Sequence, residues 1–231
     1  MSKMKEIVSL HEVVKNYCQE EVITKALRGI DLKIIEGDFS AMMGPSGCGK
    51  STLLNIIGGL DRATSGDVQF NGKDFNTLSN KTLSIMRREH IGFVFQNYNL
   101  LPVLNAYENA EYVLLLQGKP PAQRREKVMH LFQEMGLDGL EKRYPRELSG
   151  GQQQRVAIAR AVASEPQLVL ADEITANVDS ETAQSLLELM VALNKNNSTT
   201  FLFSTHDPAV IKFAKKIILL KDGNIRNEDL S

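Results

Sequence analysis

The sequence predicts an α/β fold with a mainly parallel central sheet, an N-terminal antiparallel β subdomain and an inserted helical subdomain. Three observations lead to this prediction: early strand-like alternation, later continuous apolar runs, and helical periodicity between those runs. The chain has 231 residues, of which 42% are hydrophobic and 24% are charged, as is usual for a globular protein with one main core. A chain of this size can fold without a disulfide or metal staple.

Strands of two kinds are expected. Residues 30–34 and 68–70 alternate between apolar and polar side chains, and the second segment is followed by an Asn-Gly turn signal. Such alternation is typical of half-buried antiparallel strands. Continuous apolar runs instead indicate central strands that helices cover on both faces. These runs occupy residues 39–43, 91–95, 168–171 and 201–203.

Helical periodicity appears between the strands. Apolar residues recur at i, i+3, i+4 and i+7 in residues 128–135 and again in residues 186–193. Two prolines at 120 and 121 suit the first turn of the earlier helix. Only helical signals occur from about residue 97 to 150, so we expect residues 97–154 to be a helical subdomain inserted into a core of residues 1–96 and 155–231. The whole chain, 1–231, is expected to be a single domain.

Composition excludes several classes of protein. The net charge is −1, so no global positive field would gather nucleic acid, and no nucleic-acid partner is expected. Two cysteines are too few for a secreted disulfide scaffold. No apolar run reaches the length of a membrane span, and residues 1–6 lack the apolar middle of a signal peptide. A cytoplasmic location is therefore expected.

The sharpest local motif is a glycine-rich loop that follows the apolar run 39–43 and fits the pattern G-x-x-x-x-G-K-[ST]. It consists of Gly44, Pro45, Ser46, Gly47, Cys48, Gly49, Lys50, Ser51 and Thr52. Glycines let backbone N–H groups turn toward phosphate oxygens, and a following helix directs its positive end at them. Lys50 would add a charge on the β- and γ-phosphates, and the Ser51 hydroxyl would be a magnesium ligand. The alternative is a tight glycine turn with a surface lysine.

A second motif is an apolar strand, residues 168–171, that ends in the two carboxylates of Asp172 and Glu173. Carboxylates at a strand end are costly unless they face a cation or a polar cleft. Asp172 would act on magnesium, usually through a water, and Glu173 would polarise the attacking water as general base. Taken alone, this strand end could simply be solvated, but the phosphate loop favours the catalytic interpretation.

A third motif, Ser149, Gly150, Gly151 and Gln152, follows Leu148 and precedes a helix with one apolar face. The plain interpretation is a helix N-cap and turn. The same groups also make a second anion site, because a serine and glycine N–H groups at a helix N-terminus can hold a γ-phosphate. One nucleotide cannot easily be reached from both loops within one subunit, so this site is expected to complete that of a second subunit.

These motifs, in this order and spacing, resemble the ATP-binding cassette (ABC) ATPases over about residues 7–226. The resemblance implies a P-loop NTPase core, ATP hydrolysis with ATP and Mg²⁺, and a head-to-tail dimer with two ATP molecules at its interface. It also implies that Gln96 senses magnesium and the attacking water, that His206 contacts the γ-phosphate, and that Tyr17 stacks on adenine. The plainer alternatives are that Gln96 merely ends a strand, that His206 is a surface or core histidine whose hydrogen bonds are satisfied, and that Tyr17 is a core residue.

Residues 58–61, 91–96, 99–102 and 108–109 look like the lipoprotein-release and macrolide-efflux branch of that family, which also includes cell-division ATPases. The resemblance implies a homodimer or heterodimer of ATPase subunits and an integral membrane permease in a separate chain. The ATPase would then be peripheral on the inner face of the cell membrane. The apolar residues of 100–104 would dock a helix of that partner, or they could pack within the helical subdomain. A soluble or cell-division-type ATPase that moves no solute is the alternative function, and an interaction protein with an inactive nucleotide fold is a third.

One segment departs from the family pattern. Residues 172–179 lack the proline after the glutamate and the glycine before the asparagine, although Asp179 is retained. In the family this segment crosses the dimer interface and couples the two ATP sites. Isoleucine in place of the proline removes a fixed φ and restores an N–H donor in that segment.

The expected site residues follow from these motifs and the resemblance together. The expected catalytic residues are Glu173, His206, Gln96 and Lys50. The expected nucleotide contacts are Tyr17, Gly44 to Thr52, Ser149 to Gln152, and Asp179. The expected metal ligands are Ser51, Gln96 and Asp172.

Overall fold

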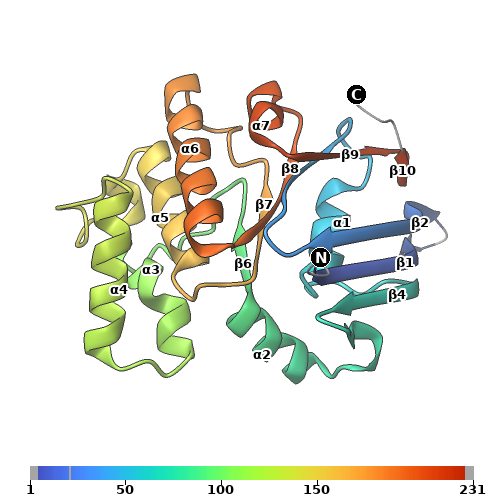
Figure 1. Cartoon of the computed structure of the whole chain (residues 1–231), viewed down its shortest axis with the longest axis horizontal. Coiled ribbons are helices and arrows are strands. Elements are labelled where there is room, and N and C mark those ends of the chain that lie inside the picture. The colour runs from blue at the N-terminus through green and yellow to red at the C-terminus, as the bar shows by residue number, and fades with distance from the viewer. Residues whose placement is uncertain (1–4, 21, 227–231) are drawn as a thin grey trace. The chain divides into compact units, whose positions relative to one another are not determined.

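The computed structural model describes residues 5–20 and 22–226, which belong to two compact units. The first unit combines the chain up to Arg87 with the chain from Thr200 onward, and the second unit is Arg88–Thr199 (Figure 1). Parallel strands with helices occur in both units, so the predicted α/β class is confirmed. No helix among the described residues is long and apolar enough to cross a membrane.

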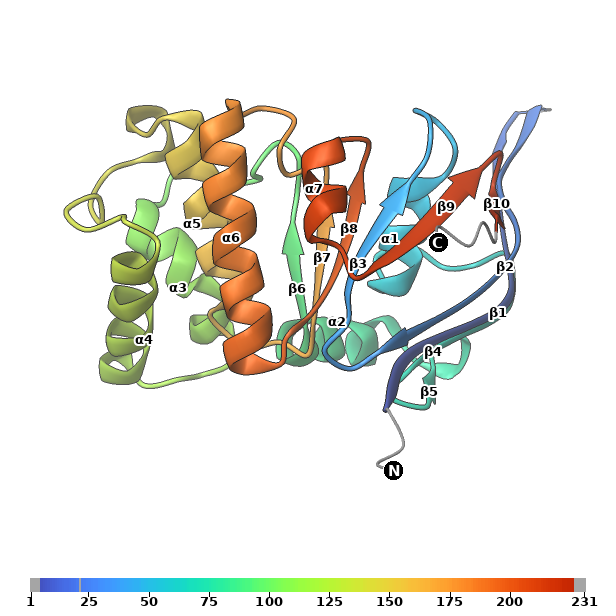
Figure 2. The ribbon, with the colours of Figure 1, turned by 45° about the horizontal axis from the view of Figure 1, so that its top comes forward.

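The first unit contains the predicted antiparallel sheet, which curves as one surface in Figure 2. Its strands, in the order β2-β1-β4-β5, are β1 (Glu6–Gln19), β2 (Val22–Ile35), β4 (Ser65–Phe70) and β5 (Lys73–Asp74). Leu10 on β1 lies opposite both Leu32 on β2 and Val68 on β4. All three side chains are buried, so the apolar half of each alternating pattern forms one face of the sheet.

The first unit also contains strands that are mostly parallel. They run in the order β10-β9-β3-β8 and are β3 (Phe39–Met43), β8 (Thr200–Thr205), β9 (Lys216–Lys221) and β10 (Asn224–Arg226). The buried rings of Phe39, Phe201 and Phe203 pack together with centroids 4.7–5.7 Å apart. Burying one phenylalanine side chain contributes about 1.5–3 kcal/mol to the free energy of folding. This packing therefore fixes β3, and with it the start of the loop that follows. The helices of this part of the chain are α1 (Lys50–Ile57), η1 (Phe75–Thr77), α2 (Asn80–His90), which runs into the second unit, and α7 (Pro208–Phe213).

The second unit has two parallel strands, β6 (Ile91–Val94) and β7 (Leu168–Asp172). Its α-helices, which stand next to one another in Figure 2, are α3 (Ala106–Leu116), α4 (Pro121–Glu134), α5 (Gly150–Val162) and α6 (Ser180–Asn197). A short 3-10 helix, η2 (Pro145–Glu147), precedes α5. Helix α5 packs so closely on β6 that a Cβ on Gly92 would lie 2.3 Å from the Ala161 carbonyl oxygen. Only glycine fits there, which explains this glycine inside an apolar strand.

Each apolar run and each helical period of the sequence corresponds to an element. The run 91–95 forms β6, which ends at Val94, and α4 begins at Pro121 as the proline signal predicts. Residues 97–154, all of them described, form α3, α4, η2 and the first turn of α5. The subdomain boundaries themselves stay a prediction.

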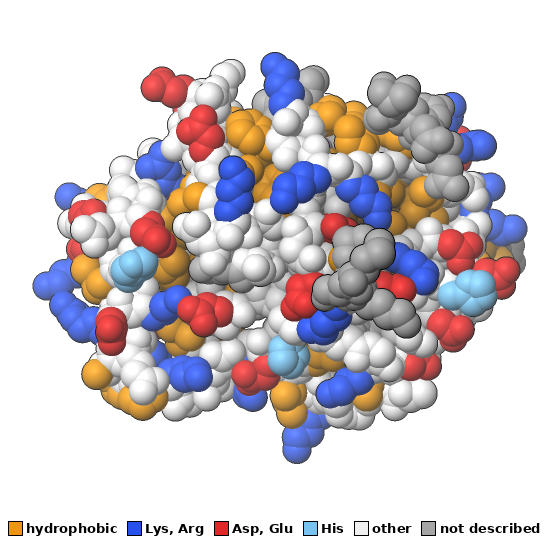
Figure 3. Space-filling model, viewed as in Figure 1, with side chains coloured by type: hydrophobic (Ala, Val, Ile, Leu, Met, Phe, Trp, Pro, Cys, Tyr) orange, Lys and Arg blue, Asp and Glu red, His pale blue; other side chains and the backbone are white. Residues whose placement is uncertain are grey.

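Over the described part of the face in Figure 3, acidic and basic side chains are interspersed, as expected for a net charge of −1.

Candidate functional site

The glycine loop leaves β3 at Gly44 and ends at Gly49, the residue before α1. Gly44 leaves no room for a side chain, because a Cβ there would lie 2.0 Å from the Leu220 carbonyl oxygen and 2.6 Å from Cys48 Sγ. Gly49 has a φ of 109°, a left-handed value that favours glycine, and a Cβ there would lie 2.7 Å from the Ala26 carbonyl oxygen. The close packing of the backbone therefore selects glycine at both ends of the loop.

Helix α1 begins without a side-chain cap. Its N-cap is Gly49, and no acidic side chain lies among the described residues of its first turn. The first N–H groups of a helix have no intrahelical acceptor, and the helix dipole adds partial positive charge to them. Lys50 is buried, and its Nζ donates to the carbonyl oxygens of Gly44 at 2.7 Å and Pro45 at 3.2 Å. A helix N-terminus without a side-chain cap and a lysine charge therefore meet at one loop, which suits a phosphate.

His206 lies at the same sheet edge as this loop. In the parallel register of β3 and β8, Met43 lies opposite Thr205. Gly44 follows the first of these residues and His206 follows the second, so both leave neighbouring strands at their carboxyl ends. His206 is exposed. Ser51, in the first turn of α1, is also exposed.

Tyr17 lies near the end of β1 and is 40% exposed, so it is not a core residue. Its hydroxyl donates to Asp61 Oδ2 at 2.8 Å. Burial raises the pKa of Tyr17, a hydrogen bond with Thr52 lowers it, Asp61 raises it, and the net shift is upward. The phenol therefore stays protonated, as a hydrogen-bond donor, throughout the physiological pH range.

The acidic strand end lies beside the strand that leads to Gln96. Val94 on β6 lies opposite Ala171 on β7, so Gln96 and Asp172 follow the carboxyl ends of neighbouring parallel strands. Asp172 Oδ1 is buried, with no hydrogen-bond partner among the described residues. A desolvated carboxylate oxygen without a donor fits a hard cation such as Mg²⁺. Glu173 is half-buried and has a left-handed φ of 47°, a strained conformation of the kind found at functional sites.

The backbone at Gln96 is held from two sides. Asn177 Nδ2 donates to the Gln96 carbonyl oxygen at 2.9 Å, and the Tyr98 hydroxyl donates to the Asn177 carbonyl oxygen at 3.4 Å. Tyr98 and Asn99 have left-handed φ values of 58° and 48°. Arg160 on α5 donates to both of their carbonyl oxygens, at 2.9 and 2.6 Å, and burial lowers its pKa. The loop after β6 is therefore fixed by α5 and by the segment that follows Glu173.

Helix α5 begins with a capping box. Ser149 Oγ accepts from the Gln152 N–H at 3.3 Å, and Gln152 Oε1 accepts from the Ser149 N–H at 2.9 Å. The N-cap interpretation of this motif is thus confirmed. It does not exclude an anion site, because the cap uses a lone pair of the serine oxygen and leaves the hydroxyl proton able to donate.

Asp179 caps α6, with Oδ1 accepting from the Thr182 N–H at 2.9 Å and Oδ2 from the Thr182 hydroxyl at 2.8 Å. These hydrogen bonds lower the pKa of Asp179. A Cβ on Gly151 would lie 2.7 Å from Thr182 Cγ2, and one on Gly150 would lie 3.0 Å from the Tyr98 hydroxyl oxygen. The two glycines therefore let α5 start against α6 and against the loop after β6.

The expected site residues form one set in each unit. The set in the first unit is Tyr17, Gly44 to Thr52, and His206. The set in the second unit is Gln96, Ser149 to Gln152, Asp172, Glu173 and Asp179. Sequence reasoning gave no role to Asp61, which holds Tyr17, or to Asn177 and Arg160, which hold the backbone around Gln96. Tyr17 and Asp61 are 44 positions apart, a separation that no periodic pattern connects.

Known proteins resemble this chain over nearly its whole length. The ABC transporter family profile matches residues 27–176. The uncharacterized ABC transporter ATP-binding protein MJ0796 of Methanocaldococcus jannaschii is 43% identical over 227 residues, which cover 96% of this chain and 97% of that protein. The macrolide export ATP-binding/permease protein MacB of Marinobacter nauticus is 43% identical over 219 residues, or 95% of this chain. This chain spans only 34% of the MacB length.

Solved structures give the same result. A dimeric structure of a post-hydrolysis state of the ATP-binding cassette MJ0796, bound to ADP and Pi, matches with a TM-score of 0.91 at 42% identity and covers 96% of this chain and 98% of its own. A second dimeric MJ0796 structure also has a TM-score of 0.91 at 42% identity and covers 97% of this chain and 99% of its own. From the family profile, the sequence identity and the shared fold together, this chain belongs to the ABC transporter family.

Proposed function

We propose that this chain is the ATP-binding and ATP-hydrolysing subunit of an ABC transporter, and that it drives a separate membrane partner through ATP-dependent closing and opening of a dimer. The observation that carries the proposal is that α1 begins at Gly49 without a side-chain cap, after a loop whose carbonyl oxygens accept from Lys50 Nζ. The likeness to a cassette bound to ADP and Pi supports ATP as the substrate.

ATP binds with its β- and γ-phosphates on the first-turn N–H groups of α1 and on Lys50. Residues Gly44 to Thr52 surround these phosphates, and His206 contacts the γ-phosphate from the neighbouring strand end. The adenine stacks on the exposed ring of Tyr17. Stacking of a base on an aromatic ring is worth about 1–3 kcal/mol in nucleic-acid complexes, which is enough to select a nucleotide over bare phosphate.

Hydrolysis uses the second set of residues. Glu173 accepts a proton from the attacking water as general base, and the Gln96 side chain orients that water. Ser51, Gln96 and Asp172 would hold Mg²⁺, which neutralises charge on the phosphate oxygens when it is bound. The unpartnered, buried oxygen of Asp172 supports this assignment.

The subunits act as a head-to-tail dimer. Ser149, Gly150, Gly151 and Gln152 of one subunit contact the γ-phosphate of the ATP on the other subunit's glycine loop, and Asp179 lies at the same interface. Loss of the γ-phosphate removes these contacts, so hydrolysis separates the subunits. Two dimeric structures of a relative support the dimer. The second subunit is another copy of this chain or a related ATPase.

The membrane partner docks on the exposed apolar turn near Gln96. Val103 and Leu101 are 78% and 37% exposed, more than residues that only pack within a helical subdomain. The buried amide of Asn109 fixes this turn, accepting from the Leu101 N–H at 2.7 Å and donating to the Leu104 carbonyl oxygen at 3.0 Å. A rigid apolar turn suits a helix of a permease in a separate chain.

The transporter is of the lipoprotein-release, efflux or mechanotransmission type. The 43% sequence identity with an ATP-binding/permease protein supports such a partner. Through it, the ATPase is located on the inner face of the cell membrane.

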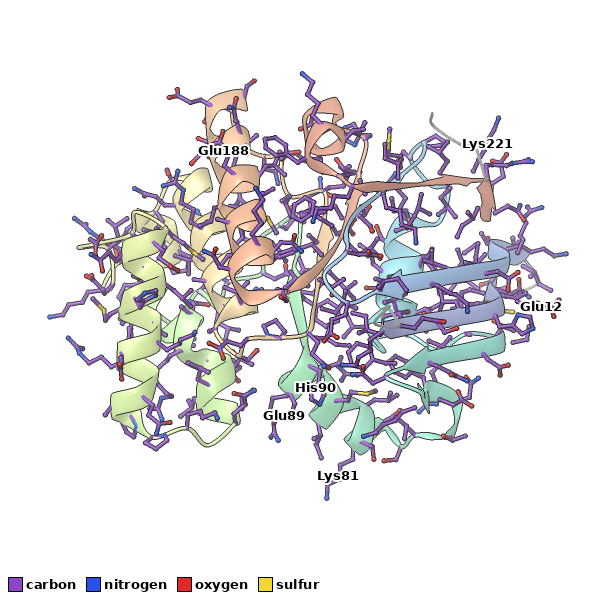
Figure 4. The ribbon with its side chains drawn as sticks, viewed as in Figure 1. Glu12, Lys81, Glu89, His90, Glu188 and Lys221 are labelled. Atoms are coloured by element: carbon purple, nitrogen blue, oxygen red, sulfur yellow. The ribbon has the colours of Figure 1, made fainter. Side chains whose placement is uncertain are left out.

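Substitution Glu173→Gln tests the proposal. We expect this variant to bind ATP, to lose turnover by about 10²- to 10⁴-fold because the general base is gone, and to accumulate as an ATP-dependent dimer in size-exclusion chromatography. The matched control is Glu188→Gln, on the outer face of α6 (Figure 4), which leaves turnover unchanged. Normal turnover by Glu173→Gln would remove Glu173 from the base role, and failure of the unaltered chain to bind ATP would refute the function.

A further inference from the structure

Asp61 holds the hydroxyl end of Tyr17, although the two residues come from different elements. Tyr17 lies on β1, and Asp61 lies in the turn after α1. The Tyr17 hydroxyl donates to Asp61 Oδ2 at 2.8 Å. The other oxygen, Oδ1, accepts from Lys15 and from the Arg62 N–H, and the phenol also makes a hydrogen bond with Thr52. The direction of the ring is therefore fixed at its hydroxyl end.

Lys15 completes this arrangement from the same strand as Tyr17. Its Nζ lies 2.7 Å from Asp61 Oδ1 and also donates to the Arg62 carbonyl oxygen at 2.8 Å. The same ammonium lies 4.8 Å from the centroid of the Tyr17 ring, within the range of a cation–π contact. The Lys15 side chain is only 12% exposed, so the charge is held in place. The ammonium therefore lies against one face of the ring, while Tyr17 as a whole remains 40% exposed.

Asp61 is itself anchored to α1. Its N–H donates to the Asn55 carbonyl oxygen at 3.2 Å, and its Oδ1 accepts from the Arg62 N–H at 2.7 Å. Arg62 in turn donates to the carbonyl oxygens of Phe75 at 3.2 Å and Leu78 at 2.7 Å. The acceptor of the Tyr17 hydroxyl is thus fixed to the helix whose N-terminus follows the glycine loop.

We propose that Asp61 is a positioning residue for nucleotide recognition: with Lys15, it holds the Tyr17 ring so that its open face receives the purine base of a nucleoside triphosphate. The inference rests on the proposed function and deepens it. A ring fixed before binding loses no rotamer freedom when the base arrives, so fixing it strengthens binding of the base and leaves phosphate binding alone. Because Asp61 is hydrogen-bonded to α1, and α1 follows the glycine loop, this connection fixes the distance between the base and the phosphates.

The pKa values of the pair agree with this geometry. Burial opposes ionisation of Asp61, but hydrogen bonds from Lys15, Tyr17 and the Arg62 N–H outweigh it and lower its pKa. The pKa of Tyr17 is raised, first through burial. At neutral pH the carboxylate is thus an acceptor and the phenol a donor.

The test compares a ligand that has a base with one that has none. Affinities of Asp61→Ala, Tyr17→Phe and the double variant are measured by calorimetry for ATP and for inorganic tripolyphosphate, both with Mg²⁺. We expect each single variant to weaken ATP binding about 3- to 10-fold and the double variant to bind ATP as well as the single variant with the lower affinity. The affinity for tripolyphosphate should be unchanged in all three variants. Asp61→Asn keeps one acceptor oxygen, so its affinity for ATP should lie between that of Asp61→Ala and that of the unaltered chain.

Asp31→Ala is the matched control. This aspartate lies on β2 of the same unit, accepts from His11 and the Glu12 N–H, and is exposed, so its removal changes neither affinity. Tyr17→Phe alone decides the question if Asp61→Ala does not fold. Equal loss of ATP and tripolyphosphate affinity, or additive effects of the two substitutions, would overturn the inference.

Failure of the proposed function gives a different result. If the unaltered chain binds neither ligand, the function itself is wrong. If Tyr17→Ala leaves ATP affinity unchanged, Tyr17 does not bind the base, and the role of Asp61 is refuted with it. If Tyr17→Ala weakens ATP binding while Tyr17→Phe and Asp61→Ala do not, only the positioning role is refuted.

Discussion

The helices α1 and α5 both begin at small residues of motifs for which we propose phosphate contacts, but they begin differently. At α1 the N-cap is Gly49, which offers no side chain to the first N–H groups. At α5, Ser149 and Gln152 cap each other reciprocally. The first helix start is therefore open to an anion on its own, whereas the second keeps part of its hydrogen-bonding capacity for itself. From this difference we propose that α1 binds the nucleotide and that α5 completes the site of the neighbouring subunit.

The largest effect is expected at the start of the glycine loop. Gly44→Ala places a Cβ 2.0 Å from the Leu220 carbonyl oxygen, so the loop must shift and ATP binding is lost. Gly72→Ala, outside the loop, is the matched variant: its Cβ meets no atom within 4 Å, and only the left-handed φ of 72° costs about 1–2 kcal/mol of stability. ATP titration and thermal unfolding measure the two effects. Unchanged ATP affinity in Gly44→Ala would contradict the account.

At α5 the cap and the phosphate contact can be separated. Ser149→Asp keeps a good N-cap, so stability is retained, but its charge repels a γ-phosphate and raises the dissociation constant of the ATP-bound dimer by at least about 100-fold. Ser149→Ala loses the cap as well, at about 1 kcal/mol of stability. Sedimentation in the Glu173→Gln background measures the dimer. If Ser149→Asp dimerises normally, α5 serves only as a capped helix.

A smaller effect is expected where the loop after β6 meets the segment after Glu173. Asn177→Ala removes the 2.9 Å hydrogen bond to the Gln96 carbonyl oxygen, which is worth about 1 kcal/mol. We expect kcat to fall about fivefold, with unchanged ATP affinity, because the Gln96 backbone is no longer held. Tyr98→Phe removes only a 3.4 Å contact and changes kcat less. A loss of ATP affinity instead of kcat would show that Asn177 supports folding of the unit.

The smallest effect concerns Asp179, the cap of a third helix. Hydrogen bonds from Thr182 lower its pKa, so its stabilisation is complete above the ordinary aspartate pKa of about 3.9 and is lost as the pH falls through the lowered value. Asp179→Asn keeps a cap that does not titrate. The Tm of the unaltered chain should therefore fall relative to that of the variant below about pH 4. A Tm difference that is constant from pH 3 to 7 would contradict this cause.

Local patterns predicted much of the fold, and contacts between distant residues explain the rest. The apolar runs that formed β3, β7 and β8 are buried on all sides, so their composition alone marks them. Strand β9 was not predicted, because its short apolar stretch is flanked by Lys216 and Lys221 and resembles a helix as much as a strand. Strand β1 was not delimited, since left-handed Glu12 and shifts of register interrupt its alternation.

The candidate site was predictable to the same extent. Residues within one motif, such as Gly44 to Thr52, could be predicted together because phosphate chemistry fixes their spacing, and their contacts with a nucleotide stay a proposal. The supporting residues were not found, because Asp61 and Asn177 act on partners 44 and 81 positions away in the sequence. Their roles follow from tertiary hydrogen bonds that leave no periodic signal. Ser149 shows a third case, in which one residue serves both a predicted cap and a proposed ligand contact.

Mixing two inactive variants tests most directly whether each ATP lies between α1 of one subunit and α5 of another. Lys50→Ala inactivates the loop, and Ser149→Asp inactivates the start of α5, so each variant alone should hydrolyse no ATP. In a head-to-tail dimer, the mixed species has one site with an intact loop from one chain and an intact Ser149 from the other. We expect an equimolar mixture to recover ATPase activity, about a quarter of the normal rate where the chains pair at random, because half of the dimers are then mixed and each has one working site. A mixture no more active than its two components would contradict the account.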